Sequence, residues 1–494
     1  MGQNLPSATP RVARDLRVII IGGGISGIGA AVKLLQAGFD NVTIFEKAAS
    51  VGGTWRENTY PGIACDIPSH LYTFTFLPNP NWSQMFAPGR EIRTYLEKVA
   101  NKFGLRNRIK FSKEVVKAIY AAGQWQIETR DGEQIACDIL ISAVGVLHVP
   151  KYPNIPGLDT FAGRTFHSSR WDHGVDLKGK RVGIIGNGSS SAQIVPQIVP
   201  QVGQLYVFQR TPQWIFPIPN EQYPIWRRAL WKMRPSLTTE LYRTLLKASY
   251  SGFGVAVVGD QEELGKLRAG CEGYLESVRD PELRKKLTPS YEVACKRLVF
   301  STQFYGAIQS PNCELITTAI EQVEPTGIRT SDGQLQECDV LILATGFQAH
   351  VFCRSIQLAG EEGLSLDQAW ARGAESFEAV GLAGFPNFFM VGGPFSTVGN
   401  LSFVTCAELE ADYIVKLLQT LVRENAKAIV PTPAAQQRFM GDVRSRGTKT
   451  VWESGCNSWY LDEHGHVAIW TKTPEEFVEM IKSGPRPADY RLVN

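Results

Sequence analysis

The sequence contains no apolar run as long as a membrane-spanning helix requires. Its longest apolar stretches, residues 17–28 and 252–259, fall short of the roughly 20 residues that a bilayer span needs. Residues 1–14 also contain no apolar segment of the kind found in secretory signals. We therefore expect a cytoplasmic protein with no integral membrane segment.

Charge of one sign is not in excess either. Lys and Arg number 51 against 48 for Asp and Glu, which leaves a formal net charge of +3 on 494 residues. So small an excess creates no field that would gather nucleic acid, and small-molecule partners are expected instead. The length and the 44% share of hydrophobic residues indicate a globular chain of two or three domains. We expect a monomer or a homodimer.

Cysteine and histidine are few and scattered. The closest pair among the nine cysteines, Cys338 and Cys353, lies too far apart for a metal knuckle or a vicinal redox pair. The seven histidines show no ligand spacing apart from the pair His464 and His466, for which we expect an exposed loop. These patterns predict no metal site, and they predict that the thiols act mainly as small buried hydrophobes.

A buried strand near the start of the chain leads directly into a glycine-rich turn. Residues 16–21 form an apolar, β-branched run that is typical of a central parallel strand. Gly22, Gly24 and Gly27 follow in a G-x-G-x-x-G pattern, and residues 28–37 predict an Ala-rich helix. Such a turn lets backbone N–H groups and a helix N-terminus approach a pyrophosphate.

A second predicted strand, residues 42–45, ends in Glu46. A carboxylate at this position would accept hydrogen bonds from the ribose of an adenosine. The glycine pattern alone is weak evidence, but strand, turn, helix, strand and acid in one stretch favour an adenine dinucleotide site. Because the acid suits a free 2′-hydroxyl, we expect this site to bind FAD.

The same unit recurs in the middle of the chain. Residues 180–185 predict a strand, and Gly186 and Gly188 form the turn with Ser189 and Ser190, while serine replaces the third glycine. This second unit also predicts a dinucleotide site.

The acid is missing from the second unit. Arg210 and Thr211 follow the predicted strand 205–208 at the position that faces the ribose. A guanidinium and a hydroxyl suit a 2′-phosphate, so NADPH is the expected ligand. The alternative is that Arg210 is a solvated cation at a strand end.

The order of these segments predicts an α/β fold with two Rossmann-like dinucleotide-binding domains and a helical insertion in the second. Residues 137–145 and 338–346 are near-repeats, and each is expected to close one nucleotide-binding half. Residues 225–233 form an amphipathic segment of the insertion, which we expect to pack against a domain rather than touch a membrane. The expected limits are 1–148 and 385–494 for the FAD domain with the C-terminal tail, 149–217 and 291–384 for the NADPH domain, and 218–290 for the insertion.

Residues 161–172 carry a pattern that is specific to one family. Phe161, Gly163, His167 and Trp171, followed by Asp172, match the fingerprint F-x-G-x-x-x-H-x-x-x-W-P/D. With this pattern the sequence resembles the class B flavoprotein monooxygenases, and within them the type I Baeyer–Villiger monooxygenases. Further motifs similar to that family lie at 52–55, 60–62, 65–66, 209–212, 296–297, 344–347 and 392–396.

The resemblance implies an oxidoreductase in which NADPH reduces FAD and O2 adds to the flavin. The resulting C4a-peroxyflavin would attack a ketone and yield an ester or lactone. It implies Arg297 and Asp66 as catalytic residues, with the arginine holding the negative charge and the acid positioning it. Asp66 and the loop residues Gly53, Thr54 and Trp55 would also contact the flavin cofactor.

Further roles follow from the same resemblance. Lys296 and Arg210 would grip the 2′-phosphate with help from Thr211. His167 and Trp171 would couple cofactor binding to domain movement rather than perform chemistry.

Two other functions share these motifs. A flavin-containing monooxygenase that oxygenates nitrogen or sulfur in a sulfide or amine would keep nearly every cofactor residue, but it would not need Asp66 and Arg297. A flavoprotein that binds both nucleotides without turnover would have no use for Arg297 either. A disulfide reductase is excluded because Cys65 has no cysteine a few positions away.

Overall fold

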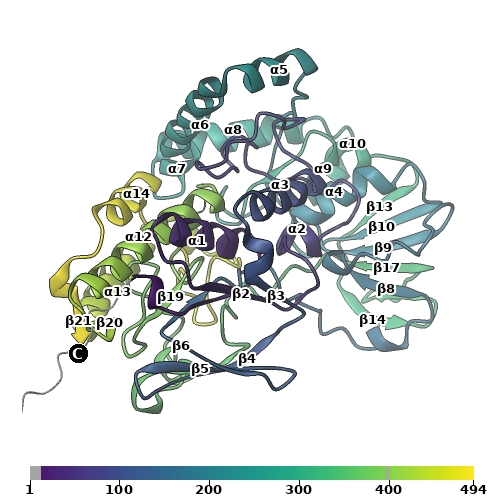
Figure 1. Ribbon diagram of the computed structural model, residues 1–494. Coiled ribbons are helices and arrows are strands. Elements are labelled where there is room, and N and C mark those ends of the chain that lie inside the picture. Colours follow the sequence, from purple (N-terminus) through teal and green to yellow (C-terminus); the bar gives the residue numbers. More distant parts are fainter. Residues whose placement is uncertain (1–12, 397–398, 400) are drawn as a thin grey trace, which may run out of the picture.

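Two parallel five-stranded sheets organise the protein, and they lie side by side in the computed structural model (Figure 1). The structure describes residues 13–396, 399 and 401–494. The strand order of the first sheet is β19 (Phe388–Met390), β7 (Ile139–Ser142), β1 (Val18–Ile21), β2 (Val42–Glu46) and β3 (Ile109–Phe111). The order of the second is β13 (Cys313–Ile316), β10 (Gln204–Phe208), β9 (Arg181–Ile185), β17 (Val340–Leu343) and β8 (Arg164–His167).

Both sheets are built on one plan. In each, the strand before the glycine turn is central, and it pairs in parallel with the next strand on one side and with a returning strand on the other. β1 thus lies between β2 and β7, and β9 lies between β10 and β17. The strands β7 and β17 fall in the two near-repeats, so the prediction that each repeat closes one half is confirmed.

A small antiparallel sheet precedes each closing strand. The first is formed by β4 (Val115–Ala121), β5 (Gln124–Thr129) and β6 (Gln134–Cys137), with β18 (Gln357–Ala359) added in parallel to β4. The second is formed by β14 (Ile320–Glu324), β15 (Gly327–Thr330) and β16 (Leu335–Glu337). Two-stranded ladders complete the strands, β11 (Ile215–Phe216) with β12 (Val299–Phe300) and β20 (Ala428–Pro431) with β21 (Tyr490–Val493).

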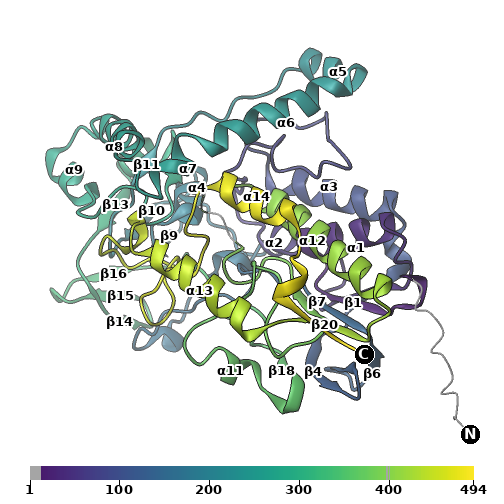
Figure 2. The same cartoon turned by 90° about the vertical axis from the view of Figure 1, so that its left-hand side faces the viewer.

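Helices from distant parts of the sequence cover the first sheet together. α1 (Ile25–Gln36) packs against α12 (Phe403–Arg423), and the two lie side by side in Figure 2. α1 begins earlier than the predicted residue 28, because it starts directly after the extended Gly24. β19 pairs with β7 of the first sheet, and before it β18 (Gln357–Ala359) already pairs with β4 in the small sheet of the same half.

The remaining helices outside the insertion connect or cover the sheets. They are α2 (Thr54–Glu57), α3 (Gly89–Lys102), α4 (Ser189–Ile198), α10 (Phe304–Ile308), α11 (Leu366–Ala369), α13 (Pro433–Gly447) and α14 (Pro474–Ser483). The last of these shows how local sequence fixes a boundary. Thr473 and Glu476 form a capping box at its N-terminus, which satisfies backbone N–H groups that the helix leaves free.

The predicted helical insertion is present. It consists of α5 (Ile225–Met233), α6 (Pro235–Tyr250), α7 (Phe253–Ala256), α8 (Gln261–Leu275) and α9 (Pro281–Leu287), with α5 and α6 at the outer edge of the molecule in Figures 1 and 2. The expected packing of α5 is correct for Trp231, which is buried. It is wrong for Ile225, Trp226 and Met233, because these side chains face solvent on the opposite side of the helix.

None of the helices in the described parts of the chain combines the length and apolar character needed to cross a bilayer.

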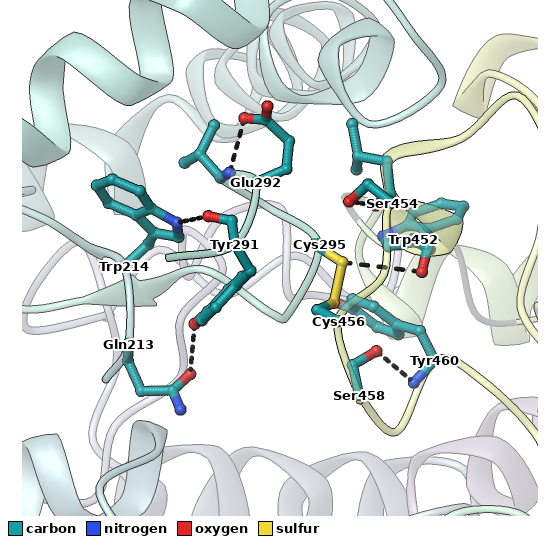
Figure 3. Close-up of a disulfide and its surroundings, with 12 residues drawn as sticks. Gln213, Trp214, Tyr291, Glu292, Cys295, Trp452, Ser454, Cys456, Ser458 and Tyr460 are labelled. Carbon is teal, nitrogen blue, oxygen red and sulfur yellow. Dashed lines mark hydrogen bonds between the residues drawn. A yellow bond between two sulfur atoms is a disulfide. The ribbon is translucent and has the colours of Figure 1, made fainter. Parts of the chain in front are cut away.

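Cys295 and Cys456 form a disulfide (Figure 3), so the prediction that the thiols act mainly as small buried hydrophobes does not hold for this pair. The two residues are 161 positions apart, so only the folded chain brings them together. The bond ties the segment that leads into Lys296 and Arg297 to the C-terminal region that carries Tyr460 (Figure 3). It therefore adds a covalent constraint between two segments that are far apart in the sequence.

We expect Cys295→Ser to lower the free energy of unfolding by about 2–4 kcal/mol, because the open chain gains conformational entropy. Thermal unfolding with and without a reductant measures the effect. The reductant should lower the melting temperature of the wild type and leave that of the variant unchanged. Cys313→Ser, at a free and partly exposed cysteine, is the control and should keep the sensitivity to reductant. A wild type that is insensitive to complete reduction would contradict this role.

Candidate active site

The first glycine turn is shaped by close backbone contacts. Gly22 has a φ of +111°, and a Cβ there would lie 2.5 Å from the carbonyl oxygen of Ala143. A Cβ on Gly27 would lie 1.9 Å from the carbonyl oxygen of Gly22. Packing alone therefore requires glycine at these two positions. Gly24 differs, because its nearest neighbour would be the Cα of Gly53 at 3.5 Å, an ordinary contact.

Glu46 lies at the end of β2 and is held firmly. Its Oε2 accepts a hydrogen bond from the backbone N–H of Gly23 at 2.7 Å, and its Oε1 accepts one from the N–H of Ala48 at 2.8 Å. Arg56 adds an ion pair to Oε1 at 3.1 Å. A carboxylate oxygen can accept more than one hydrogen bond, so Glu46 can still accept from a ligand hydroxyl.

A cavity lies against this turn. Of the residues expected to hold a cofactor, it is lined by Gly22, Gly24, Glu46, Gly53, Thr54 and Trp55. The sequence analysis missed several other lining residues, among them Lys47, Arg56, Lys113, Glu114 and His148. Lys113 and His148 could have been found, because they follow β3 and β7 at the carboxyl edge of the sheet, where open α/β sheets bind ligands.

His148 is a neutral group in this cavity. Burial, together with the nearby Lys47, lowers the pKa of its imidazole to about 4. Its Nδ1 is buried and has no hydrogen-bond partner among the described residues. The ring therefore offers an uncharged polar atom beside the cavity.

The second glycine turn repeats the geometry of the first. Gly186 has a φ of +107°, and a Cβ there would lie 2.4 Å from the carbonyl oxygen of Ala344, the counterpart of Ala143. No atom lies within 4 Å of the position that a Cβ on Gly188 would take. Ser189 and Ser190 open α4, whose N-terminus is directed at the same open space.

Arg210 and Lys296 lie near each other without acidic partners. Arg210 is exposed after β10, beside the partly buried Thr211. Lys296 is partly buried, with its Nζ 4.8 Å from the ring centre of Tyr291. Burial and the positive charge of Arg210 lower the pKa of Lys296. In the described chain neither residue forms an ion pair with an acid, so the two cations are available to an anion.

Arg297 and Asp66 form a close ion pair. The Nη2 and Nε atoms of Arg297 lie 2.6 Å and 2.8 Å from Oδ2 of Asp66. Burial opposes the charge on Arg297, but Asp66 and the neighbouring Tyr460 outweigh it and raise the pKa of the guanidinium. Arg297 is therefore positively charged at every pH at which the protein is folded, and one carboxylate oxygen fixes two of its nitrogens.

The loop that carries Asp66 belongs to the first half but docks on the second. Tyr60 donates a hydrogen bond from its hydroxyl to Gln193 on α4 at 3.0 Å, and Gln193 donates one to the carbonyl of Ala64 at 3.0 Å. Gly62 has a φ of +81°, and a Cβ there would lie 2.6 Å from the carbonyl oxygen of Gln193. The ion pair between Arg297 and Asp66 thus lies at the junction of the two halves.

The fingerprint residues lie on β8 and on the segments just before and after it. His167 is fully buried, with Nε2 3.0 Å from the carbonyl oxygen of Gly346 and Nδ1 2.9 Å from Oγ of Ser169. Burial lowers the pKa of His167, which makes the ring neutral at physiological pH. The structure therefore gives His167 a bridging position between β8 and the turn after β17.

The other three fingerprint residues have packing contacts. A Cβ on Gly163 would lie 2.4 Å from the carbonyl oxygen of Asp339, so no larger residue fits. Trp171 packs edge-on against Phe166, with ring centres 5.1 Å apart. Phe161 packs against the hydrophobic cluster on one side of the second sheet.

Two residues near the fingerprint that sequence reasoning missed connect the halves. Arg170 forms an ion pair with Glu57 on α2 at 2.7 Å. Nε2 of His173 lies 2.8 Å from the hydroxyl of Thr59. The fingerprint segment thus contacts both the turn after β17 and the region of α2 in the first half.

Comparisons with known proteins agree with this arrangement. The family model described as flavin-binding monooxygenase-like matches residues 15–250. An uncharacterized monooxygenase of Mycobacterium tuberculosis is 43% identical over 475 residues, 96% of each chain. A Baeyer–Villiger monooxygenase of Streptomyces coelicolor is 41% identical over 473 residues, which is 94% of this chain and 91% of that protein.

A solved structure is similar over the whole length of this chain. The crystal structure of OTEMO in complex with FAD and NADP superimposes with a TM-score of 0.87 at 27% identity, covering 97% of this chain and 100% of that one. The α/β fold with two dinucleotide-binding halves is therefore confirmed. The chain belongs to the family of flavin-binding monooxygenases, as the resemblance of its motifs predicted.

Proposed function

We propose that this monooxygenase binds FAD and NADPH and converts a ketone, with O2, into an ester or lactone. The observation that carries the proposal is the ion pair between Arg297 and Asp66 at the junction of the two halves. The name of the relative from Streptomyces coelicolor and the two cofactors in the OTEMO structure support it. We propose the predicted limits for the domains: 1–148 with 385–494 for FAD, 149–217 with 291–384 for NADPH, and 218–290 for the insertion. Within 291–384, the strand β18 pairs with β4 of the first half.

The cavity at the first turn fits FAD. The glycine turn, Glu46 and the loop of Gly53, Thr54 and Trp55 line it together. Gly24 lacks the side chain that would project toward a pyrophosphate, and Glu46 is already oriented by Gly23 and Ala48. These groups would hold the pyrophosphate and the ribose respectively.

The second turn fits NADPH. The open space beside Gly188 and the N-terminus of α4 suit a pyrophosphate. Arg210 and Lys296 supply two cations for a 2′-phosphate. Burial and the positive charge of Arg210 lower the pKa of Lys296, and an anion bound between the two cations would offset their repulsion. Thr211 adds a hydroxyl next to Arg210.

When bound, the two cofactors supply the hydride transfer and the activation of O2. Arg297 holds a permanent positive charge where an oxygen nucleophile and then the alkoxide of the ketone adduct carry negative charge. Asp66 is a positioning residue, because it acts by fixing the guanidinium at 2.6 Å and 2.8 Å.

This charge distinguishes the proposed ketone oxidation from oxygenation of nitrogen or sulfur. Transfer to a soft heteroatom uses an electrophilic, protonated oxidant, which a fixed guanidinium does not favour. Nucleophilic attack on a carbonyl develops negative charge twice, and Arg297 stabilises it both times.

Arg297→Ala should still allow NADPH to reduce the flavin but should lower ester formation by about 100- to 1,000-fold, because one preorganised donor to the developing anion is lost. Rapid-mixing absorbance measures reduction, and product analysis with cyclic, linear and aryl ketones measures oxygenation. Arg329→Ala, which removes a guanidinium from a surface ion pair with Glu324, is the control. Undiminished ester formation by Arg297→Ala would refute the role of this arginine.

Arg210→Ala should raise the KM for NADPH by about 10-fold or more and leave the KM for NADH nearly unchanged, because only NADPH carries the 2′-phosphate. Steady-state oxidation of each nucleotide measures the ratio. Lys178→Ala removes an exposed cation elsewhere and should change neither value. An equal increase in the KM for both nucleotides would show that Arg210 does not recognise the 2′-phosphate.

Gly188→Ala and Gly186→Ala should have different effects, although both glycines lie in one turn. Gly188→Ala should fold normally and bind NADPH more weakly, because its methyl group enters space that no protein atom occupies. Gly186→Ala should lower the melting temperature, because its Cβ collides with the carbonyl of Ala344. Thermal unfolding and the KM for NADPH together separate the two effects. A destabilised Gly188→Ala with an unchanged KM would contradict the assignment of this turn.

A further inference from the structure

The helix α5 turns apolar side chains toward solvent. Ile225, Trp226 and Met233 expose 77%, 64% and 73% of their surface, and among the described residues Tyr152 is the other large apolar side chain that is strongly exposed. Ala229 is exposed as well. With 3.6 residues per turn, positions 225, 226, 229 and 233 fall on one face of the helix. We call these four residues the α5 face.

The opposite side of α5 fixes this orientation. Trp231 is buried there, and its ring centre lies 4.4 Å from that of His70 and 5.0 Å from that of Tyr223. Turning the α5 face inward would expose Trp231 and break both ring contacts. The outward direction of the α5 face is therefore a consequence of packing in the core.

Positive charge surrounds the α5 face. Lys232 projects from the same side of the helix, and Arg234 follows at the junction with α6; both are exposed. The solvent side of α6 adds Arg243 and Lys247 against one exposed acid, Glu240. An apolar strip with an aromatic residue and flanking Lys and Arg side chains is the pattern of helices that lie in the interface of an anionic membrane.

We propose that the α5 face docks the protein on a surface of anionic phospholipid. Trp226, Ile225 and Met233 would enter the boundary between headgroups and acyl chains, while Lys232 and Arg234 contact the headgroup phosphates. The attachment is peripheral, because α5 has only nine residues. It goes beyond the proposed oxidation and does not depend on which substrate is oxidised.

Lipid fits the α5 face better than a second copy of the chain. A two-fold dimer through this face would bring Lys232 and Arg234 of both copies into one interface, and this excess of positive charge is unfavourable. The helix also stands at the outer edge of the molecule (Figures 1 and 2). A projecting strip is suited to a deformable surface.

Co-sedimentation of the purified protein with vesicles tests the proposal. We expect at least about tenfold stronger binding to vesicles that contain phosphatidylglycerol than to phosphatidylcholine vesicles, and weaker binding as salt is raised. A double substitution, Ile225→Ser with Trp226→Ser, should lower binding about tenfold or more, because two large apolar side chains are lost. Lys232→Glu with Arg234→Glu should abolish the preference for phosphatidylglycerol.

Two matched controls complete the experiment. Tyr152→Ser removes an exposed apolar side chain outside α5, and Lys178→Glu reverses an exposed charge outside the insertion; both should bind vesicles like the wild type. All α5 variants should keep the wild-type melting temperature, since the altered side chains are exposed.

Three results would overturn the proposal. The first is that the wild type stays in the supernatant with phosphatidylglycerol vesicles at low salt. The second is that the controls lose as much binding as the α5 variants. The third is a dimer in sedimentation velocity that the α5 substitutions convert to monomer, which would make the α5 face an interface between copies.

Discussion

The contact between the two halves of the protein is the constraint on which the site depends. A loop of the first half reaches α4 of the second and is held there by Tyr60 and Gln193, and this places Asp66 against Arg297. Neither half contains both members of the ion pair. The guanidinium of Arg297, to which we assign a role in the reaction, is therefore held by Asp66 only when the two nucleotide-binding halves are docked on each other.

Much of the architecture could be predicted because it is encoded locally. The strand before each glycine turn is nearly all apolar, and the turn supplies glycine where the closing strand's carbonyl leaves no room, at Gly22 and Gly186. Each of these features lies within a short stretch of sequence. The repeated closing segments likewise gave β7 and β17, because buried parallel strands are apolar along their whole length.

What could not be predicted depends on contacts between distant segments. Cys295 and Cys456 are 161 positions apart, and no spacing rule connects them. The orientation of α5 is a similar case, since Trp226 and Trp231 have the same hydrophobicity and only the packed core decides which of them is buried. The contacts of Arg170 and His173 with the loop at Glu57 and Thr59 also arise only in the folded chain.

Gly62 sets how closely the two halves can approach. Its missing side chain is what allows the loop backbone to lie against the carbonyl of Gln193, where a Cβ would come within 2.6 Å. A methyl group on Gly62 would push the two halves apart at this contact, although Gly62 belongs to neither glycine turn. Two cofactors that are each well bound would then lie too far apart for hydride transfer. Gly62 therefore limits the distance between the two cofactors.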